Sequence, residues 1–416
     1  MNAVPPSRAL TTLTTLVGAL LLAYPVLTLS VKGGTNAVLL LLLLLALWVR
    51  FASPKDLRPS QWGQPAWRGY LAAMLALPLV TLVSQLANQP FSGHAHDAPA
   101  RYFLALPVFF LLQRLPLRAF DGLLPGCALA TLAGWLLSRP LDEGRLGVPA
   151  LDLIHYGDLA LLLGVLALCG LLRPAHTGLR ALYLLGGLAG IAASLLSGSR
   201  GGWLALPVLL LLVLHHRGWG WQKLLATLLA LCLLVSALFA ASPAFQQRVT
   251  RLGDDYRAWQ VGNHDTSLGA RLQLYRAAIS TVAQHPLLGV GPTGFAAETV
   301  RLQQAGQLTP YAAQLGQGEI HNDLLSKAAG MGLPGLLAML AIYLVPLHLF
   351  RRAARLSPAQ RYYALLGKVF VLACLIFGLS VEFLNLTLAT AFYSLGVAIL
   401  LAACYNPHHP TKDSHV

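Results

Sequence analysis

The stretch that decides the fold runs from Gly318 to Gly335 and reads GEIHNDLLSKAAGMGLPG. It joins a long polar segment, residues 242–320, to a long apolar one. His321 stands at the boundary between the two, followed directly by Asn322. A histidine at such a boundary has two interpretations. It is either a functional group that faces the polar segment or, together with Asn322, a simple cap of a membrane helix.

The length of the apolar run limits how it can lie in a membrane. A continuous helix from His321 to Phe350 would be about 45 Å long, whereas the hydrocarbon core of a bilayer is about 30 Å thick. Either the first turns stand above the membrane, or the helix bends at one of its helix-weakening residues, Gly330, Gly332 and Pro334. Both alternatives place His321 at the boundary between water and lipid.

Composition indicates the class of protein. Of the 416 residues, 56% are hydrophobic and only 11% are charged, and the charges fall between Leu-rich runs. This pattern predicts an all-α polytopic membrane protein. The runs are continuously apolar and do not alternate, which argues against a transmembrane barrel. No internal repeat is visible, so we expect one membrane domain, residues 1–416, which contains 242–320 as a large loop.

Twelve stretches are apolar enough to be candidate membrane spans. They are 10–31, 36–52, 69–87, 99–113, 119–137, 154–172, 181–197, 202–216, 223–241, 329–350, 362–380 and 386–404. The large loop then lies between the ninth and the tenth span.

The positive charges are distributed unevenly between the two sides of this arrangement. With the N-terminus inside, the inner connections carry Arg50, Lys55, Arg58, Arg68, Arg114, Arg118, Arg173, Arg180, Arg217, Lys223, Arg351, Arg352, Arg355 and Arg361. The short outer connections carry only Lys32, Arg101, Arg139, Arg145 and Arg200. This bias predicts that both termini are cytoplasmic and that the large loop faces outward. It also accounts for much of the net charge of +14, so no nucleic-acid partner is expected.

The large loop is too long for an ordinary connection and too polar to be buried, so we expect it to carry function. Residues 269–285 have helical spacing and end at Pro286, which stops a helix. Residues 287–295, with their glycines and proline, predict a turn, and 296–304 predict a second short helix.

Arginines collect on the predicted outer face. Arg200 lies in SGSRGGW, residues 197–203, and Arg101 opens the fourth span. Arg271 and Arg276 lie five residues apart on the predicted loop helix. Guanidinium groups form paired hydrogen bonds to phosphate oxygens and stay charged at any relevant pH. Anchoring to lipid headgroups is the alternative for each of them, although an anchor would not need the glycines around Arg200.

Several motifs are absent. The sequence contains no GxxxxGK[ST] for ATP, no DxD pair for a metal-bound nucleotide sugar and no GxSxG serine elbow. HAHD at 94–97 lacks further ligands nearby, so no metal is expected. A histidine base, His321, together with permanent cations suits group transfer from a membrane-embedded pyrophosphate carrier. The donor is already activated, and the base needs only to take a proton from a hydroxyl acceptor.

Four motifs resemble those of one known family. HNDLL at 321–325 and GMGLPGLL at 330–337 look like the signature at which the large outer loop re-enters the membrane in bacterial O-antigen ligases. HPLLGVGPTGF at 285–295 and SGSRGGW at 197–203 are similar to patterns of the same family. The resemblance covers roughly 180–340 by motif and the remainder by topology.

The resemblance implies a membrane glycosyltransferase of the type that uses polyprenyl donors, without cofactor or metal. It would transfer O-antigen polysaccharide from undecaprenyl pyrophosphate to a sugar hydroxyl of lipid A-core, on the periplasmic face of the bacterial inner membrane. The family's roles would fall on His321 as the base that activates the acceptor, and on Arg200 and Arg271 as pyrophosphate contacts. Arg101 and Arg276 are weaker candidates for the same contacts. Asn322 or Glu319 would orient His321.

Two alternatives remain open. An O-antigen polymerase or a protein O-oligosaccharyltransferase of the same superfamily would share the donor and differ in the acceptor. A transporter of lipid-linked sugars would normally carry charges near the bilayer midplane. Here Asp158 and Lys368 lie close to span ends, which disfavours transport.

Overall fold

The computed structural model describes residues 8–52, 57, 59–88, 91–241 and 243–406, and for some of these, Arg200 among them, only the backbone. Most of the described chain is helical, which confirms the predicted all-α class. The helices are α1 Arg8–Ser30, α2 Gly34–Ala52, α3 Arg68–Ala87, α4 Asp97–Leu112, α5 Leu123–Leu137, α6 Leu153–Cys169, α7 Thr177–Ser197, α8 Arg200–His216, α9 Trp221–Ala241, α10 Pro243–Gln260, α11 Ser267–Gln284, α12 Phe295–Gln304, α13 Pro310–Gly316, α14 Asp323–Ala353, α15 Pro358–Gly378 and α16 Thr387–Cys404. Two short strands, β1 Arg139–Pro140 and β2 Leu146–Gly147, pair antiparallel between α5 and α6.

Each of the twelve predicted spans falls on a helix, namely α1 to α9 and α14 to α16. Within the described part of the chain, nine helical segments are long and apolar enough to cross a membrane. They contain α1, α2, α3, α5, α6, α7, α14, α15 and α16. The helices α4 and α8 are shorter, with 16 and 17 residues. The chain is therefore a multi-pass helical membrane protein.

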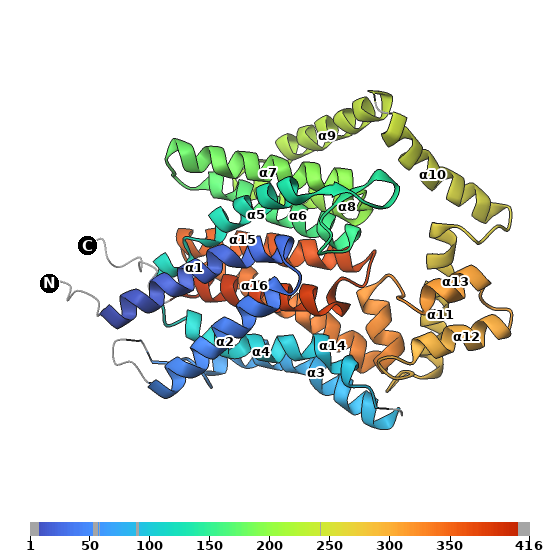
Figure 1. The fold of residues 1–416 in the computed structure, drawn as a ribbon, viewed down its shortest axis with the longest axis horizontal. Coiled ribbons are helices and arrows are strands. Elements are labelled where there is room, and N and C mark those ends of the chain that lie inside the picture. The colour runs from blue at the N-terminus through green and yellow to red at the C-terminus, as the bar shows by residue number, and fades with distance from the viewer. Residues whose placement is uncertain (1–7, 53–56, 58, 89–90, 242, 407–416) are drawn as a thin grey trace.

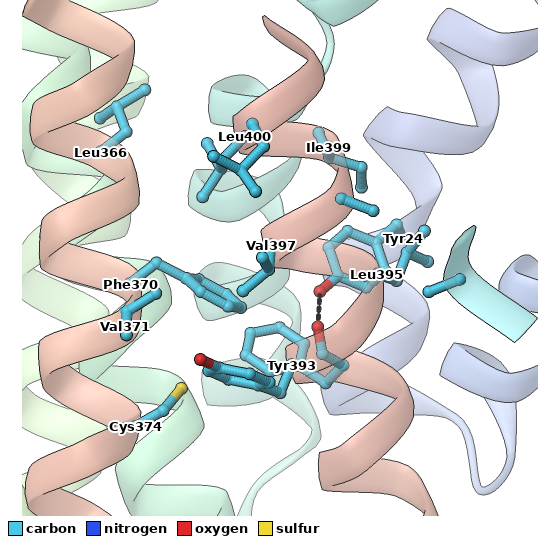
Figure 2. Packing of buried hydrophobic residues seen from close by; sticks show 14 of the residues in the cluster. Tyr24, Leu366, Phe370, Val371, Cys374, Tyr393, Leu395, Val397, Ile399 and Leu400 are labelled. Atoms are coloured by element: carbon cyan, nitrogen blue, oxygen red, sulfur yellow. Dashed lines mark hydrogen bonds between the residues drawn. The ribbon is translucent and has the colours of Figure 1, made fainter. Parts of the chain in front are cut away.

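Three helices form the centre of the bundle because they are apolar on all sides. Most of α6, α15 and α16 is buried against other helices. Figure 2 shows how α1 joins this centre: the hydroxyl of Tyr24 donates a hydrogen bond of 2.7 Å to the carbonyl oxygen of Phe392. Nearby, the rings of Phe370 and Tyr393 stack at 6.0 Å between centroids.

The segment between α9 and α14 folds into helices of its own. The helices predicted at 269–285 and 296–304 correspond to α11 and α12, which begin one or two residues earlier than predicted, whereas α10 and α13 were not expected from the sequence. Figure 1 shows α10 projecting from the bundle, while α11, α12 and α13 gather at one end of it, near the start of α14. This group has its own small core, which includes Leu274, Phe295 and Leu302 and reaches Ala329 of α14.

The long helix α14 is interrupted at Gly332, where φ is 67° and ψ is −162°. Of the two alternatives that the sequence left open, the structure has the bend, and it lies at Gly332. The loop before α12 docks on the interruption: Leu333 N–H donates to the carbonyl of Pro286 at 2.7 Å, and Val290 N–H donates to that of Ala329 at 3.1 Å. These bonds pair backbone groups that the interruption of the helix would otherwise leave unsatisfied. Gly289 lies in the contact, since a Cβ there would be 2.3 Å from the backbone of Gly330.

The two ends of the described chain lie on the same side of the helix bundle. In Figure 1, α1 begins and α16 ends on the side of the molecule opposite the group formed by α11, α12 and α13. The loop helices and the described ends of the chain are thus on opposite sides of the bundle.

Candidate active site

His321 lies in the short connection between α13 and α14, in an unusual backbone conformation. Its φ is 62°, and no other non-glycine residue in the described chain has a positive φ. The side chain is 7% exposed. A left-handed residue of this kind costs free energy and persists only where its surroundings enforce it, commonly at functional sites.

Two neighbouring side chains hold this conformation. The Asn322 side chain caps α14, because its Oδ1 accepts hydrogen bonds from the backbone N–H groups of Leu324 and Leu325, both at 3.0 Å. The hydroxyl of Tyr275, on α11, donates to the backbone carbonyl of His321 at 2.9 Å. Asn322 is therefore the cap of α14, and the imidazole of His321 is not used for capping.

The imidazole contacts a carboxylate. Nδ1 of His321 lies 2.6 Å from Oε1 of Glu319. Burial alone would raise the pKa of Glu319, but the contact with His321, together with the charge of His155 and the backbone N–H of Glu382, lowers this pKa below its ordinary value. Neither ring nitrogen meets the geometry of a hydrogen bond with a described residue: Nδ1 contacts Glu319 at ion-pair distance, and Nε2 is buried with no partner. A carboxylate at Nδ1 favours the tautomer in which Nε2 is free to accept a proton.

The connection between α15 and α16 supports this pair. Glu382 accepts hydrogen bonds from the N–H of Ile320 and from the hydroxyl of Ser326, the latter at 2.8 Å. Its own N–H donates to Oε2 of Glu319 at 3.2 Å. Burial raises the pKa of Glu382 above its ordinary value, although the charge of Lys327 and the two hydrogen bonds oppose this.

The start of α14 is fastened to the same connection. Asp323 is 1% exposed and accepts from the hydroxyl of Tyr343 at 2.9 Å and from the N–H of Leu384 at 3.0 Å. One turn further, Nζ of Lys327 donates to Oδ1 of Asn385 at 2.8 Å. The segment that carries His321 is therefore fixed on both sides by residues 379–385.

Arg200 is the first residue of α8, and its side chain lies outside the described part of the structure. Its backbone lies beside the α15–α16 connection, since a Cβ on Gly201 would be 2.5 Å from Oγ of Ser380. Ser199, on the other side of Arg200, donates through its hydroxyl to Asp158 of α6. The close packing around Gly201 therefore requires a glycine at this position whether or not a ligand binds nearby. It also places Arg200 next to the segment that holds His321.

The other three predicted arginines differ in their surroundings. Arg271 lies one turn before Tyr275 on α11, is partly buried, and forms no hydrogen bond or ion pair with any described residue. Arg276 is exposed and lies over the ring of Trp259, 5.1 Å from its centroid. Arg101 donates to Oδ1 of Asn36 at 3.2 Å and to the backbone oxygen of Asp97. Arg271 thus lies on the helix face that is directed toward the His321 segment. Arg276 and Arg101 instead contact residues outside the candidate site.

Sequence reasoning missed several members of the site. Tyr275 and Glu382 contact the His321 segment directly, and Arg145 donates from Nε to the carbonyl of Ser197 at 2.6 Å, beside Arg200. One signal was available for Tyr275, since it lies four residues from Arg271 and so shares its helix face. Glu382 is an acidic residue in a short connection between two apolar runs, which is also visible in the sequence.

The HAHD motif forms only a surface pair. Nδ1 of His94 lies 3.0 Å from Oδ2 of Asp97, and the histidine side chain is 96% exposed. Over the described ranges, no three His, Cys, Asp or Glu side chains gather as metal ligands would.

One comparison with known proteins covers the part of the chain that contains these residues. A sequence model of a protein family described as O-antigen ligase matches residues 185–340. This range contains α8, α11 and the His321 segment. The chain is also 27% identical over 310 residues to an uncharacterized protein of Haemophilus influenzae (strain ATCC 51907 / DSM 11121 / KW20 / Rd). That match covers 71% of this chain and 76% of the relative.

Proposed function

Because residues 185–340 carry the domain of the O-antigen ligase superfamily, we propose that this protein is a membrane glycosyltransferase acting on lipopolysaccharide. It transfers O-antigen polysaccharide from undecaprenyl pyrophosphate to a sugar hydroxyl of lipid A-core. The observation that carries the proposal is the His321–Glu319 pair. This pair has a buried and unpartnered Nε2 and lies where the loop helices meet the bundle.

The reaction uses this pair as a general base. Nε2 of His321 takes the proton of the acceptor hydroxyl, and the hydroxyl oxygen attacks the anomeric carbon of the donor sugar. The bond between that carbon and the pyrophosphate oxygen breaks, and undecaprenyl pyrophosphate leaves with the bonding electrons. Glu319 stabilises the imidazolium that forms on His321.

Cations stabilise the departing pyrophosphate. Arg271 is suited to this role because its guanidinium has no partner among the described residues and lies on the same helix face as Tyr275. Arg200 is placed at the same connection by its backbone. Guanidinium groups aimed at developing negative charge lower the barrier without further reorganisation. The donor supplies its own activation, so neither ATP nor a metal is required.

We further propose that the site faces the periplasm and that both termini are cytoplasmic. Two observations support this orientation. The inner connections carry most of the arginines and lysines, as is usual for cytoplasmic loops. The described ends of the chain and the loop helices lie on opposite sides of the bundle (Figure 1).

Reconstitution tests the chemistry. Purified protein is mixed with lipid-linked O-antigen and lipid A-core in excess EDTA and without ATP, and the product is followed by gel electrophoresis. We expect transfer under these conditions. Loss of activity in chelator that magnesium or manganese restores would show that a metal is required, and the mechanism above would be wrong.

The nearest alternatives are an O-antigen polymerase and a protein O-oligosaccharyltransferase, which the superfamily domain allows equally. The lipopolysaccharide pattern of a deletion strain separates ligase from polymerase. Loss of the polymer ladder, with polymer still on the lipid carrier, is expected for a ligase. A core that carries one repeat unit would indicate a polymerase, and an intact ladder with unglycosylated proteins would indicate a protein-directed enzyme.

A further inference from the structure

A second pair of histidine and carboxylate lies at the start of α6. Asp152 caps this helix, since its Oδ1 accepts from the N–H groups of Ile154 at 2.9 Å and of His155 at 3.3 Å. The same oxygen lies 3.1 Å from Nδ1 of His155. The bond from His155 lowers the pKa of Asp152 to about 2, so the carboxylate is ionised at any physiological pH.

The other nitrogen of His155 is left without a partner. The residue is 6% exposed, and Nε2 is buried with no hydrogen-bond partner among the described residues. A buried polar atom that stays unpaired costs free energy, and such atoms are rare in native proteins unless a ligand or water satisfies them. With Nδ1 already directed at Asp152, Nε2 is the atom left for a ligand.

His155 belongs to the surroundings of the proposed site. Its ring stacks on Phe383, with centroids 5.7 Å apart and an angle of 10° between the planes. Phe383 follows Glu382 directly in the connection that supports the His321 segment. The charge of His155 also contributes to lowering the pKa of Glu319. Two histidines from distant parts of the chain are therefore gathered around one connection.

The neighbours of His155 indicate what its ligand would be. Asp158, one turn further on α6, accepts from Ser199, which directly precedes Arg200. Arg145 contacts the same hairpin through the carbonyl of Ser197. The ionisable groups around His155 on its own helix and in the facing loop are the carboxylates of Asp152, Asp158 and Glu319. Donation from Nε2 requires the imidazolium form of His155, in which Nδ1–H faces the carboxylate of Asp152 and Nε2–H is left for an anionic ligand, whose charge would favour that form.

We propose that His155, held by Asp152, is a second substrate-contacting histidine. Its Nε2–H donates a hydrogen bond to a phosphate oxygen of the lipid-linked pyrophosphate. This inference rests on the proposed function. It assigns a residue to the binding of the lipid-linked donor substrate, whereas His321 acts on the acceptor substrate. It assigns His155 to binding and leaves proton removal from the acceptor to His321.

Direct binding tests it with the full-length protein in detergent. The probe is undecaprenyl pyrophosphate, and undecaprenol, which has no phosphate, is the comparison. H155N removes the Nε2 donor but keeps an amide N–H near the position of Nδ1, so the contact with Asp152 is retained. H94N is the matched control, because His94 pairs with Asp97 with the same spacing in the sequence but on the surface.

We expect H155N to bind undecaprenyl pyrophosphate about tenfold or more weakly than the wild type, as for loss of one hydrogen bond to a charged group. H94N should bind like the wild type. Equal binding by H155N and the wild type would overturn the inference, as would a defect confined to the KM for lipid A-core. If the wild type itself does not prefer the pyrophosphate over undecaprenol, the proposed function is wrong, which is a separate result.

A second pair of variants covers the case in which H155N does not fold. H155Q and H155M have similar volumes, but only Gln offers a nitrogen donor near the position of Nε2. We expect H155Q to retain most of the binding and H155M to lose it. Equal binding by these two variants would show that His155 acts only through packing.

Discussion

Nδ1 of His321 lies 2.6 Å from Oε1 of Glu319, although only Ile320 separates the two residues in the chain. Side chains two residues apart do not face each other in a helix. The positive φ of His321 turns the chain so that they do. The positive φ of His321 and its contact with Glu319 therefore occur together. In this conformation Nε2 of His321 is directed away from the carboxylate.

Replacing Glu319 by Gln should slow transfer without weakening donor binding. The amide cannot stabilise the imidazolium that forms on His321, and loss of a hydrogen bond to a charged group corresponds to roughly tenfold or more in rate. The measurement is kcat and KM for both substrates. The matched control is Glu298→Gln, because Glu298 pairs with Arg301 on α12. Equal kcat values for the two variants would remove Glu319 from the mechanism.

The pH dependence of kcat should show which ionisable group of the site causes the loss of activity in acid. The pKa of Glu319 is lowered, so this carboxylate stays ionised as the pH falls from 7 to about 5, and its contribution to stability is lost only below its ordinary range. The pKa of Glu382 is raised, so its protonation is the competing cause of an acid limb. We expect the acid limb of kcat to be the same in the wild type and in Glu382→Gln, because a general base must be unprotonated to take the proton of the acceptor. Disappearance of the limb in Glu382→Gln would assign it to Glu382.

The sequence predicted those features that depend on local pattern. Each of the twelve continuous apolar runs coincides with a helix, and α11 ends before Pro286 as predicted. Glycine and proline marked the candidate positions of a bend in α14, but the sequence could not choose between a bend and a straight helix. The helices α10 and α13 could not be predicted from the sequence, because polar or very short segments have no clear apolar periodicity. His321 could be singled out because a histidine at a membrane boundary is conspicuous.

The surroundings of His321 could not be predicted in this way. His155, Tyr275 and Glu382 come from three elements that are far apart in the chain, and only tertiary packing brings them to one connection. The left-handed backbone of His321 is a property of that packing as well, since histidine has no strong preference for it. The sequence left open whether His321 is a functional group or, together with Asn322, a simple helix cap, and in the structure Asn322 alone caps α14.

Arg271 and Arg276 offer a matched pair on one helix. Arg271 lies on the face that contacts His321, whereas Arg276 stacks on Trp259. We expect Arg271→Ala to raise the KM for the lipid-linked donor or to lower kcat by about tenfold or more, because a desolvated contact between a guanidinium and a phosphate is lost. Arg276→Ala should change neither by more than about twofold, as for a surface substitution. If both variants kept full activity, anchoring to lipid headgroups would be the better explanation for Arg271.

The break in α14 should depend on glycine. A Cβ on Gly332 would lie 2.5 Å from the carbonyl oxygen of Pro286, and φ at this position is positive. Gly332→Ala therefore combines a backbone cost of about 1–3 kcal/mol, for a conformation that is essentially restricted to glycine, with a clash that displaces the docked loop. Gly306→Ala is the control, since Gly306 also has a positive φ but open space around it. The thermal unfolding midpoint in detergent should fall further for Gly332→Ala, and equal shifts would mean that the docked loop adds no stability.

His321→Asn tests the base more sharply than His321→Ala. Asn tolerates the left-handed conformation better than most residues, so this variant adds little backbone strain. It can still donate to Glu319, and Asn322 continues to cap α14. What it lacks is the proton acceptor at Nε2. We therefore expect normal insertion, an unchanged melting temperature and retained binding of undecaprenyl pyrophosphate, with transfer reduced by about 10²–10⁴, as for removal of a general base. Transfer is measured by the lipopolysaccharide ladder in cells and by kcat with purified substrates. A ladder of near-normal intensity would leave His321 a structural residue, and the base would have to be sought elsewhere in the site.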